Sequence, residues 1–353
     1  MRVALTGIKG DFVKGSGSGI VRYNTELYDN LIRRKLDVGI LEFRNLFQYT
    51  LKTGLNDLSG YDIIHNPVGI KVTIPFRKGK AKMVNTVHDL IFIKNPELYN
   101  ERTKVKDSLS VSLRKKLLLD YSKISIWSDI KFSDHIITDA ALVKNELVEM
   151  GLSRNTVSVV PLGVDKRFIK KAASKKNKIF TVGYIGSFQR KKNVGFAIEA
   201  FNKFQKIYAK GSIMELWGSP KSPEYEYTRS LAANNKNIIF KGFAPEEMIV
   251  QTYDRFHVAV FPIISTGFEL EILEAQSRGI PVITCKDSKI PSEVRKYCLE
   301  SKNAEHAAEI IKNLAENGYN EKAAKIAMRY ARTFTWDRTA EETIKVYNKI
   351  IED

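Results

Sequence analysis

Cysteine and histidine are scarce in this sequence. Cys285 and Cys298 are the only cysteines in 353 residues, and there are five histidines. Two cysteines cannot form a disulfide framework, and with so few histidines they cannot complete a zinc site either. The scarcity excludes a small disulfide-stabilised scaffold and favours a reducing, cytoplasmic setting.

Long apolar runs are missing as well. No stretch approaches the about 18 consecutive apolar residues of a membrane-spanning helix. The first residues, MRVALTGIKGDF, contain too short an apolar run for a signal peptide. We therefore expect a soluble protein, or at most one attached to a membrane surface.

Positive charge, in contrast, is abundant. The 57 lysines and arginines outnumber the 40 aspartates and glutamates, which gives a net charge of +17. The excess is spread along the chain, because residues 1–163 carry 25 basic and 17 acidic side chains and the rest carries 32 and 23. Such a surface attracts phosphate groups of any kind, whether in nucleotides, nucleic acid or anionic lipid. The charge alone does not choose among these partners.

Short apolar runs alternate with longer segments of helical periodicity. Strands are expected at 2–7, 37–43, 61–67, 81–89, 135–140, 157–163, 178–187, 211–219, 237–243, 257–262 and 280–285, and helices at 19–35, 141–151 and 193–210. This alternation predicts an α/β protein with doubly wound parallel sheets. The length fits two domains, 1–163 and 164–335, with a basic, solvated linker at 165–178. Two such sheets would place the carboxyl ends of their strands around one cleft.

Three glutamates lie close together in STGFELEILEAQSRGIPVIT, residues 265–284. The pattern predicts a helix over 268–278 that ends at a glycine and lies between two strands. Glu269 and Glu271 would lie in its first turn, where acidic side chains stabilise the helix dipole without any further role. Glu274 would lie one turn later between apolar neighbours, where a carboxylate requires a partner such as a sugar diol.

The segment FPIISTGFELEILEAQSRGIPV, residues 261–282, resembles the signature of the group 1 (family 4) retaining glycosyltransferases. In that family the two glutamates of an E-x7-E pattern contact the nucleotide-sugar donor. The second glutamate holds the ribose hydroxyls, a role that the resemblance gives to Glu274. The resemblance also implies donor contacts from the matching residues Gly267, Phe268 and Leu270.

Two residues depart from that signature. Thr266 stands in place of the first glutamate, which lies beside the donor sugar in the family, and Glu269 replaces the second glycine. In one interpretation Thr266 hydrogen-bonds a sugar hydroxyl and Glu269 supplies the lost carboxylate. In the other the site has drifted and turns over slowly or not at all. The first interpretation is favoured.

A second segment, VGYIGSFQRKKNVGFAIEAF at 182–201, resembles the basic loop of the same family. Lys192 matches the lysine that contacts the donor diphosphate, and Lys191 takes the place of its arginine neighbour. Cations beside a helix N-terminus form a ready site for a diphosphate, although such a loop on its own could equally be solvated. The two lysines could stabilise the departing diphosphate without a metal, and no DxD-type metal motif occurs in a plausible loop.

Two segments of the first domain also resemble the family. SGIVRYNTEL at 18–27 matches its first loop and helix, and implies that Gly17 and Gly19 let the donor phosphate approach the backbone closely. TVHDL at 86–90 matches a motif whose histidine lies near the donor sugar and the acceptor. The resemblance gives His88 a hydrogen-bonding role in the active site and Asp89 a supporting one, whereas a lone histidine is more often structural.

The resemblance covers nearly the whole chain. It implies the GT-B architecture, in which two Rossmann-like domains face each other across a cleft and a closing helix, here at about 336–353, returns to the first domain. It implies a retaining, metal-independent enzyme without cofactor that moves a hexose from a nucleotide sugar, with UDP or GDP, to a glycan, lipid-linked or other hydroxyl acceptor. Front-face attack requires no protein nucleophile, so Thr266 is compatible with activity.

Three alternatives are weighed against this interpretation. A protein of the same fold could bind nucleotide sugars without transferring them. A basic nucleic-acid-binding protein lacks support, since no basic repeat interleaved with aromatic residues is present, and no nucleic acid partner is expected. A nicotinamide-dependent enzyme is disfavoured because GSGSGI at 15–20 departs from the dinucleotide fingerprint.

The basic segment SLRKKLLLDYSKISIW at 112–127 permits two interpretations. It could lie on an anionic membrane surface, which would make the protein peripheral at the inner face and bring it to a lipid-linked acceptor. It could equally be a core helix with a solvated basic edge.

Overall fold

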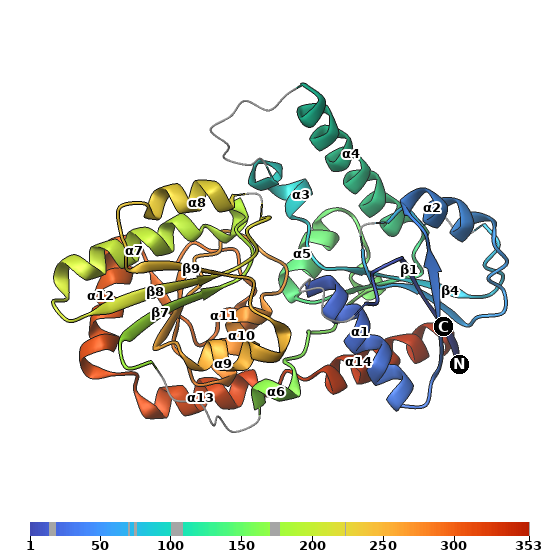
Figure 1. Cartoon of the computed structure of the whole chain (residues 1–353). Coiled ribbons are helices and arrows are strands. Elements are labelled where there is room, and N and C mark those ends of the chain that lie inside the picture. Colours follow the sequence, from blue (N-terminus) through green and yellow to red (C-terminus); the bar gives the residue numbers. More distant parts are fainter. Residues whose placement is uncertain are drawn as a thin grey trace. The chain divides into compact units, whose positions relative to one another are not determined.

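The computed structural model describes residues 1–13, 19–69, 71–73, 76–99, 109–169, 177–222 and 224–352. The chain forms two compact units (Figure 1). Unit 1 comprises Met1–Lys94, Ser108–Gly163 and Phe334–Asp353, and unit 2 comprises Asn95–Asp107 and Val164–Thr333. The chain therefore leaves unit 1 twice, after Lys94 and after Gly163, and its last helix belongs to unit 1 again.

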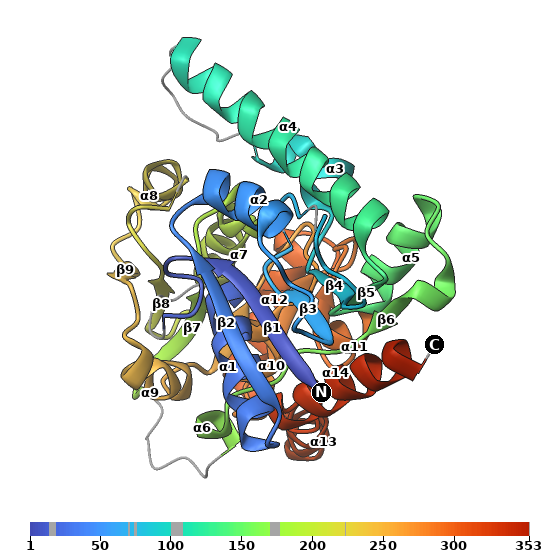
Figure 2. The ribbon, with the colours of Figure 1, turned by 90° about the vertical axis from the view of Figure 1, so that its right-hand side faces the viewer.

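Unit 1 is built on a six-stranded parallel sheet with the order β2-β1-β3-β4-β5-β6 (Figure 2). Its strands are β1 (Arg2–Ile8), β2 (Asp37–Phe43), β3 (Ile63–Asn66), β4 (Lys82–Val87), β5 (His135–Thr138) and β6 (Val157–Val159). Its helices are α1 (Gly19–Arg33), α2 (Leu46–Leu55), α3 (Ile91–Lys94), α4 (Leu109–Phe132), α5 (Ala141–Glu149), the 3₁₀ turn η2 (Arg154–Thr156) and α14 (Trp336–Glu352). The central strands are buried on both faces, as is typical of a parallel sheet covered by helices.

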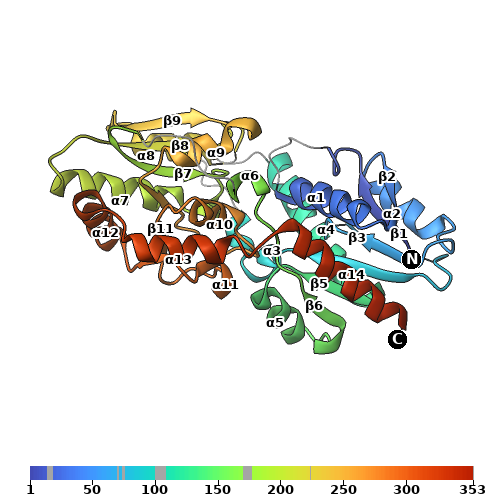
Figure 3. The ribbon, with the colours of Figure 1, turned by 90° about the horizontal axis from the view of Figure 1, so that it is seen from below.

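Helix α14 packs against α1 (Figure 3). Its buried side chains recur at helical spacing, from Trp336 to Ile350, and form one apolar stripe. Two polar contacts fix its position: Arg34 donates to Asp337 at 3.0 Å, and the Tyr347 hydroxyl lies 2.5 Å from Nδ1 of buried His65. The last helix of the chain thus completes unit 1.

Unit 2 has a second six-stranded parallel sheet with the order β12-β11-β10-β7-β8-β9. Its strands are β7 (Phe180–Ile185), β8 (Ser212–Trp217), β9 (Ile238–Gly242), β10 (Val258–Val260), β11 (Val282–Cys285) and β12 (Leu299–Ser301). Its α-helices are α6 (Lys166–Ile169), α7 (Val194–Ile207), α8 (Tyr225–Ala232), α9 (Ile249–Asp254), α10 (Leu270–Ser277), α11 (Ser292–Arg295), α12 (Ala304–Asn317) and α13 (Glu321–Ala331). Short 3₁₀ turns are η1 (Pro96–Tyr99), η3 (Arg190–Lys192) and η4 (Glu246–Met248).

All strands expected from the sequence are present, and three local expectations need correction. β12 was not foreseen, because a three-residue strand at a sheet edge carries too short an apolar pattern. α10 begins at Leu270 and not at Phe268, since Glu269 has extended backbone angles. The start of the expected solvated linker is the short helix α6, whose Phe168 is fully buried in unit 2. Residues 170–176 of that linker lie outside the described residues.

Each sheet reverses its strand order at one point. In unit 1 the reversal falls between β1 and β3, and in unit 2 it falls between β7 and β10. At such a switch point the loops after the two neighbouring strands turn to opposite faces and leave a crevice at the carboxyl edge of the sheet. The side chains after β1, β3, β7 and β10 are therefore the first place to look for a ligand site.

Candidate functional site

Three loops of unit 2 are joined at the switch point of its sheet. The loop after β7 contains η3, the loop after β10 leads into α10, and residues 286–290 follow β11. The Ile264 N–H donates to the Lys191 carbonyl at 2.8 Å, and the Lys289 N–H donates to the Ile264 carbonyl at 2.8 Å. These backbone hydrogen bonds hold the two segments that resemble the glycosyltransferase family next to each other.

The Lys192 ammonium group forms an ion pair with the Glu269 carboxylate across this switch point. A second carboxylate, that of Glu271, lies 3.9 Å from the same nitrogen. The side chains of Lys192 and Glu269 are only 11% and 3% exposed. Burial raises the pKa of Glu269 to about 7, with a further increase from Glu271 that Lys192 opposes.

Glu269 occupies the N-cap position of α10 but its side chain makes no capping hydrogen bond. Its carboxylate instead pairs with Lys192, so Glu269 has a charged partner in addition to its place at the start of the helix. Glu271 does lie in the first turn of α10, with a side chain that is 30% exposed.

Glu274 is buried on α10, where the sequence predicted a carboxylate in need of a partner. The Tyr253 hydroxyl, on α9, donates a hydrogen bond to its Oε2 at 2.9 Å. Sequence analysis did not find this tyrosine, because no motif links the end of α9 to α10. A carboxylate can accept several hydrogen bonds, so one tyrosine does not exhaust the capacity of Glu274.

The loop that contains Thr266 is held in place by backbone contacts with Lys289. The Thr266 N–H donates to the Lys289 carbonyl at 3.2 Å, next to a parallel bridge between Ser265 and Lys289. Thr266 and Gly267 are buried, Phe268 is half-buried and Leu270 begins α10 as a buried residue. All predicted residues of this segment thus gather at the start of α10.

The basic loop ends at the start of α7. Lys191 is half-buried and Lys192 is buried in η3, and Asn193 follows with left-handed backbone angles, φ 52° and ψ 40°. As N-cap of α7, Asn193 makes no side-chain capping bond. Backbone amides at such an uncapped helix start are suited to an anion.

The glycine-rich loop of unit 1 is described only at its end. Gly17 lies outside the described residues, and Gly19 is the first residue of α1. A Cβ placed on Gly19 would meet no described atom within 4 Å. Packing within the described chain therefore does not require a glycine at this position.

His88 follows β4 and is paired through both of its ring nitrogens. Nδ1 lies 2.7 Å from the Asp139 carboxylate, and Nε2 lies 2.9 Å from the Pro67 carbonyl. Burial lowers the pKa of His88, but Asp139 and the Pro67 carbonyl raise it by more, so the net shift is upward. Two oxygen acceptors favour the doubly protonated imidazolium. Asp89 accepts a 3.4 Å bond from the Ile91 N–H at the start of α3.

Asp139 was missed by sequence analysis, although a signal existed. It directly follows β5, which pairs with β4, so His88 and Asp139 leave neighbouring strands at the same edge of the sheet. Tyr23 of α1 packs edge-on against the His88 ring at a centroid distance of 4.8 Å. The histidine is thus held in one orientation by three elements of unit 1.

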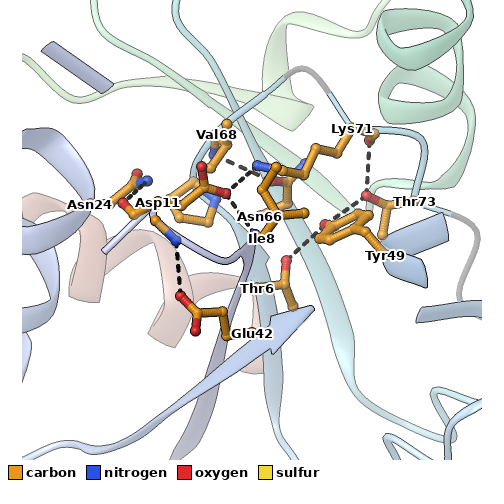
Figure 4. Close-up of polar contacts among 12 residues, drawn as sticks. Thr6, Ile8, Asp11, Asn24, Glu42, Tyr49, Asn66, Val68, Lys71 and Thr73 are labelled. Carbon is orange, nitrogen blue, oxygen red and sulfur yellow. Dashed lines mark hydrogen bonds and ion pairs between the residues drawn. The ribbon is translucent and has the colours of Figure 1, made fainter. Parts of the chain in front are cut away.

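A buried ion pair also crosses the switch point of unit 1 (Figure 4). The Lys71 ammonium lies 2.6 Å from Asp11 Oδ2, which also accepts the Ile8 N–H at 2.7 Å. Burial lowers the pKa of Lys71, against the opposing effect of Asp11. Burial also raises the pKa of nearby Asp129 well above its usual value, and neither Asp129 carboxyl oxygen has a hydrogen-bond partner among the described residues. Sequence analysis missed this cluster because none of the motifs that it identified contains Asp11, Lys71 or Asp129.

The described residues contain no group of three or more His, Cys, Asp or Glu side chains that could hold a metal ion. Within the same ranges, no helix combines the length and the apolar content needed to cross a bilayer.

Two doubly wound sheets, the second with a lysine and two glutamates at its switch point, define a class of α/β protein that binds its ligands at the carboxyl edges of the sheets. Residues 179–317, which contain Lys192, Glu269 and Glu274, match the family model described as glycosyl transferases group 1. The match confirms the resemblance stated from the sequence for this part of the chain.

Curated relatives carry glycosyltransferase names. The D-inositol 3-phosphate glycosyltransferase of Acidothermus cellulolyticus is 22% identical over 318 residues, which cover 83% of this chain and 68% of that protein. The O-antigen chain mannosyltransferase B of Escherichia coli is 24% identical over 309 residues, which cover 83% of this chain and 75% of that protein.

Solved structures share the architecture. HepE of Anabaena, in complex with UDP-glucose, aligns with a TM-score of 0.70 and 16% identity over 99% of this chain and 100% of that chain. At this identity the likeness shows the fold alone. It confirms the predicted α/β architecture of two Rossmann-like units, the GT-B fold of glycosyltransferases.

Proposed function

We propose that this protein is a retaining glycosyltransferase that moves a hexose from a nucleotide sugar to a hydroxyl acceptor, without a metal or a cofactor. The observation that carries the proposal is the set of charged side chains at the switch point of unit 2. Lys192 forms an ion pair with Glu269 there, and Glu274 lies buried on α10. All three residues lie in the segment that matches the group 1 family model. HepE holds UDP-glucose on the same fold, which supports a UDP sugar as the first donor to test.

In this proposal each residue of unit 2 has a separate task. Lys191, Lys192 and the amides at the start of α7 stabilise the negative charge that develops on the departing nucleoside diphosphate. Glu274 accepts hydrogen bonds from the ribose hydroxyls. Thr266 and Glu269, with Gly267, Phe268 and Leu270, border the hexose.

Retention follows from front-face attack, in which the departing phosphate takes the proton of the acceptor hydroxyl. The acceptor then adds to the anomeric carbon as the bond to the diphosphate breaks, and no covalent glycosyl-enzyme forms. This route suits a site with Thr266 where a protein carboxylate is otherwise found.

Unit 1 supplies the acceptor side in this proposal. His88, cationic and fixed by Asp139 and the Pro67 carbonyl, provides positive charge on the acceptor side. Asp89 supports the segment, and Gly17 and Gly19 admit the donor phosphate. The curated relatives act, by their names, on an O-antigen chain and on an inositol phosphate, which supports a glycan or another polyhydroxylated acceptor.

A lipid-linked acceptor is supported by the surface of α4. Leu113, Leu117, Ile124 and Trp127 are each more than half exposed, and their spacing places them on one face of the helix. The exposed lysines Lys116, Lys123 and Lys131 accompany them, and the Lys131 ammonium lies over the Trp127 ring at 4.7 Å. Apolar side chains flanked by lysines suit an anionic membrane surface, at the cytoplasmic face in this proposal.

Calorimetry tests the donor site. UDP, GDP and ADP, and their common hexose conjugates, are titrated into the wild type, into Glu274→Ala and into Glu316→Ala, an exposed glutamate at the end of α12 that serves as the matched control. We expect one nucleotide to bind the wild type and the control alike and to bind Glu274→Ala at least about tenfold more weakly, which a lost hydrogen bond to a charged group accounts for. A product assay with the same conjugate then tests transfer.

Two other outcomes distinguish the rival functions. Tight nucleotide-sugar binding without consumption by any acceptor tested would identify a binding protein of the same fold. No nucleotide binding, together with salt-sensitive binding of DNA or RNA, would replace the transferase by a nucleic-acid-binding protein.

A further inference from the structure

Glu269 is an addition to the donor site and not part of the family pattern, because it stands where the signature has a glycine. Its carboxylate is buried and ion-paired with Lys192, the lysine proposed to bind the donor diphosphate. The Glu269 carboxylate thus neutralises the ammonium group that the donor diphosphate needs as its partner.

The surroundings of Lys192 carry more negative than positive charge. Glu269 pairs with it directly and Glu271 approaches to 3.9 Å, so two carboxylates face one ammonium group. A nucleoside diphosphate adds at least two further negative charges. With little solvent around the pair to screen repulsion, diphosphate and Glu269 carboxylate cannot both remain charged beside Lys192 without a large penalty.

We infer that the diphosphate of the donor and the Glu269 carboxylate compete for Lys192, and that Glu269 takes up a proton from solvent when the nucleotide binds. The inference rests on the proposed function, since it assigns the diphosphate to Lys192. Neutral Glu269 keeps a hydroxyl and a carbonyl oxygen, which can then hydrogen-bond the hexose. The residue that blocks the site in its charged form thereby becomes part of the site in its neutral form.

Among the ionisable groups around Lys192, Glu269 is the one expected to change its protonation state when the nucleotide binds. Lys192 approaches from η3, Glu271 belongs to its own helix, and Tyr184 lies on β7. Burial raises the pKa of Tyr184 well above its usual value, so the phenol stays neutral. The pKa of Glu269, already about 7 without ligand, rises further when a diphosphate adds negative charge nearby.

A pH dependence follows with a defined sign. Above pH 7 the free protein holds Glu269 charged, so binding has to import a proton and weakens by up to about tenfold per pH unit. Measurements between pH 7 and 8.5 avoid the terminal phosphate of the nucleotide, whose own pKa is about 6.

The test is calorimetric titration of the full chain with UDP, GDP and ADP in turn, at several pH values. Each titration is repeated in HEPES and in Tris, whose different ionisation enthalpies reveal proton uptake as a difference in observed heat. We expect uptake of up to one proton by the wild type. Glu269→Gln abolishes the uptake and the pH slope and binds the nucleotide about tenfold more tightly than the wild type at pH 8. Glu316→Gln, at an exposed glutamate near the end of α12, is the matched control and keeps both.

The outcomes distinguish a failure of this inference from a failure of the proposed function. Nucleotide binding by the wild type with no buffer dependence overturns the inference and leaves the proposed function standing, and this result needs no variant to fold. An unchanged pH slope in Glu269→Gln overturns it as well. Absence of binding by any of the three nucleotides, in the wild type and in Glu269→Gln, overturns the proposed function and the inference with it.

Discussion

At the scale of single residues, Tyr253 stabilises the buried Glu274 carboxylate in the free protein. It donates the 2.9 Å hydrogen bond to a carboxylate that is otherwise buried on α10. Tyr253→Phe removes one donor from a buried charge, and we expect a loss of about 1–3 kcal/mol in the free energy of unfolding. Urea unfolding of the variant measures this loss. Tyr225→Phe, a partly exposed tyrosine of α8, is the matched control, and equal losses in both variants would contradict the assignment.

His88 is predicted to make stability depend on pH through Asp139. The folded-state pKa of His88 is raised, so its contribution is fully present below about pH 6.5, the unfolded value, and is lost as pH rises through the folded value. In Asp139→Asn the acceptor charge is gone, and only the Pro67 carbonyl and Asp89 still oppose the effect of burial, so the His88 pKa falls and the slope becomes smaller.

Urea unfolding between pH 5.5 and 8.5 tests whether the slope becomes smaller in Asp139→Asn. His88→Gln should show neither slope. If the free energy of unfolding depends on pH in the same way in the wild type and in Asp139→Asn, then Asp139 does not raise the pKa of His88 as described.

At the scale of elements, the exposed face of α4 is predicted to bind membranes. Leu117 and Trp127 are 61% and 56% exposed, so their replacement costs little in folding. We expect Leu117→Ala combined with Trp127→Ala to weaken binding to phosphatidylserine vesicles at least about tenfold, because two large apolar side chains no longer leave water. Co-sedimentation measures the binding.

The control for this element is Leu55→Ala, which removes an equally exposed leucine, 57%, from the end of α2. It should leave vesicle binding unchanged. If wild-type protein does not sediment with anionic vesicles at low salt, α4 is instead an ordinary helix with a solvated basic edge.

At the scale of the whole molecule, unit 1 is closed by the crossing of two distant segments. A Cβ on Gly163 would lie 2.1 Å from the Trp336 nitrogen, so the chain leaving unit 1 touches the chain returning to it. Gly163→Ala forces backbone apart, and we expect it to destabilise the protein by about 1–3 kcal/mol in urea unfolding. Gly211→Ala, at a glycine with no atom within 4 Å of the added Cβ, should change stability little. Similar stability of both variants would show that the crossing tolerates displacement.

The sequence by itself determined the α/β class, the positions of β1 to β11 and of α1, α5 and α7, and the identity of Lys192 and Glu274 as site residues to test. These follow from local information, because apolar periodicity and short motifs act over a few residues. The start of α10 and the edge strand β12 were predicted less well, since backbone angles at a helix entry and short edge strands leave little pattern.

Only the tertiary structure decided how the charges are paired. Lys192 meets Glu269 across 77 residues, Glu274 meets Tyr253 across 21, and His88 meets Asp139 across 51. Such pairs depend on which strands become neighbours in each sheet and on how much water remains between the loops that follow them. Glu269, for which the sequence alone required no more than a helix-dipole role, is thereby a buried partner of the lysine at the switch point.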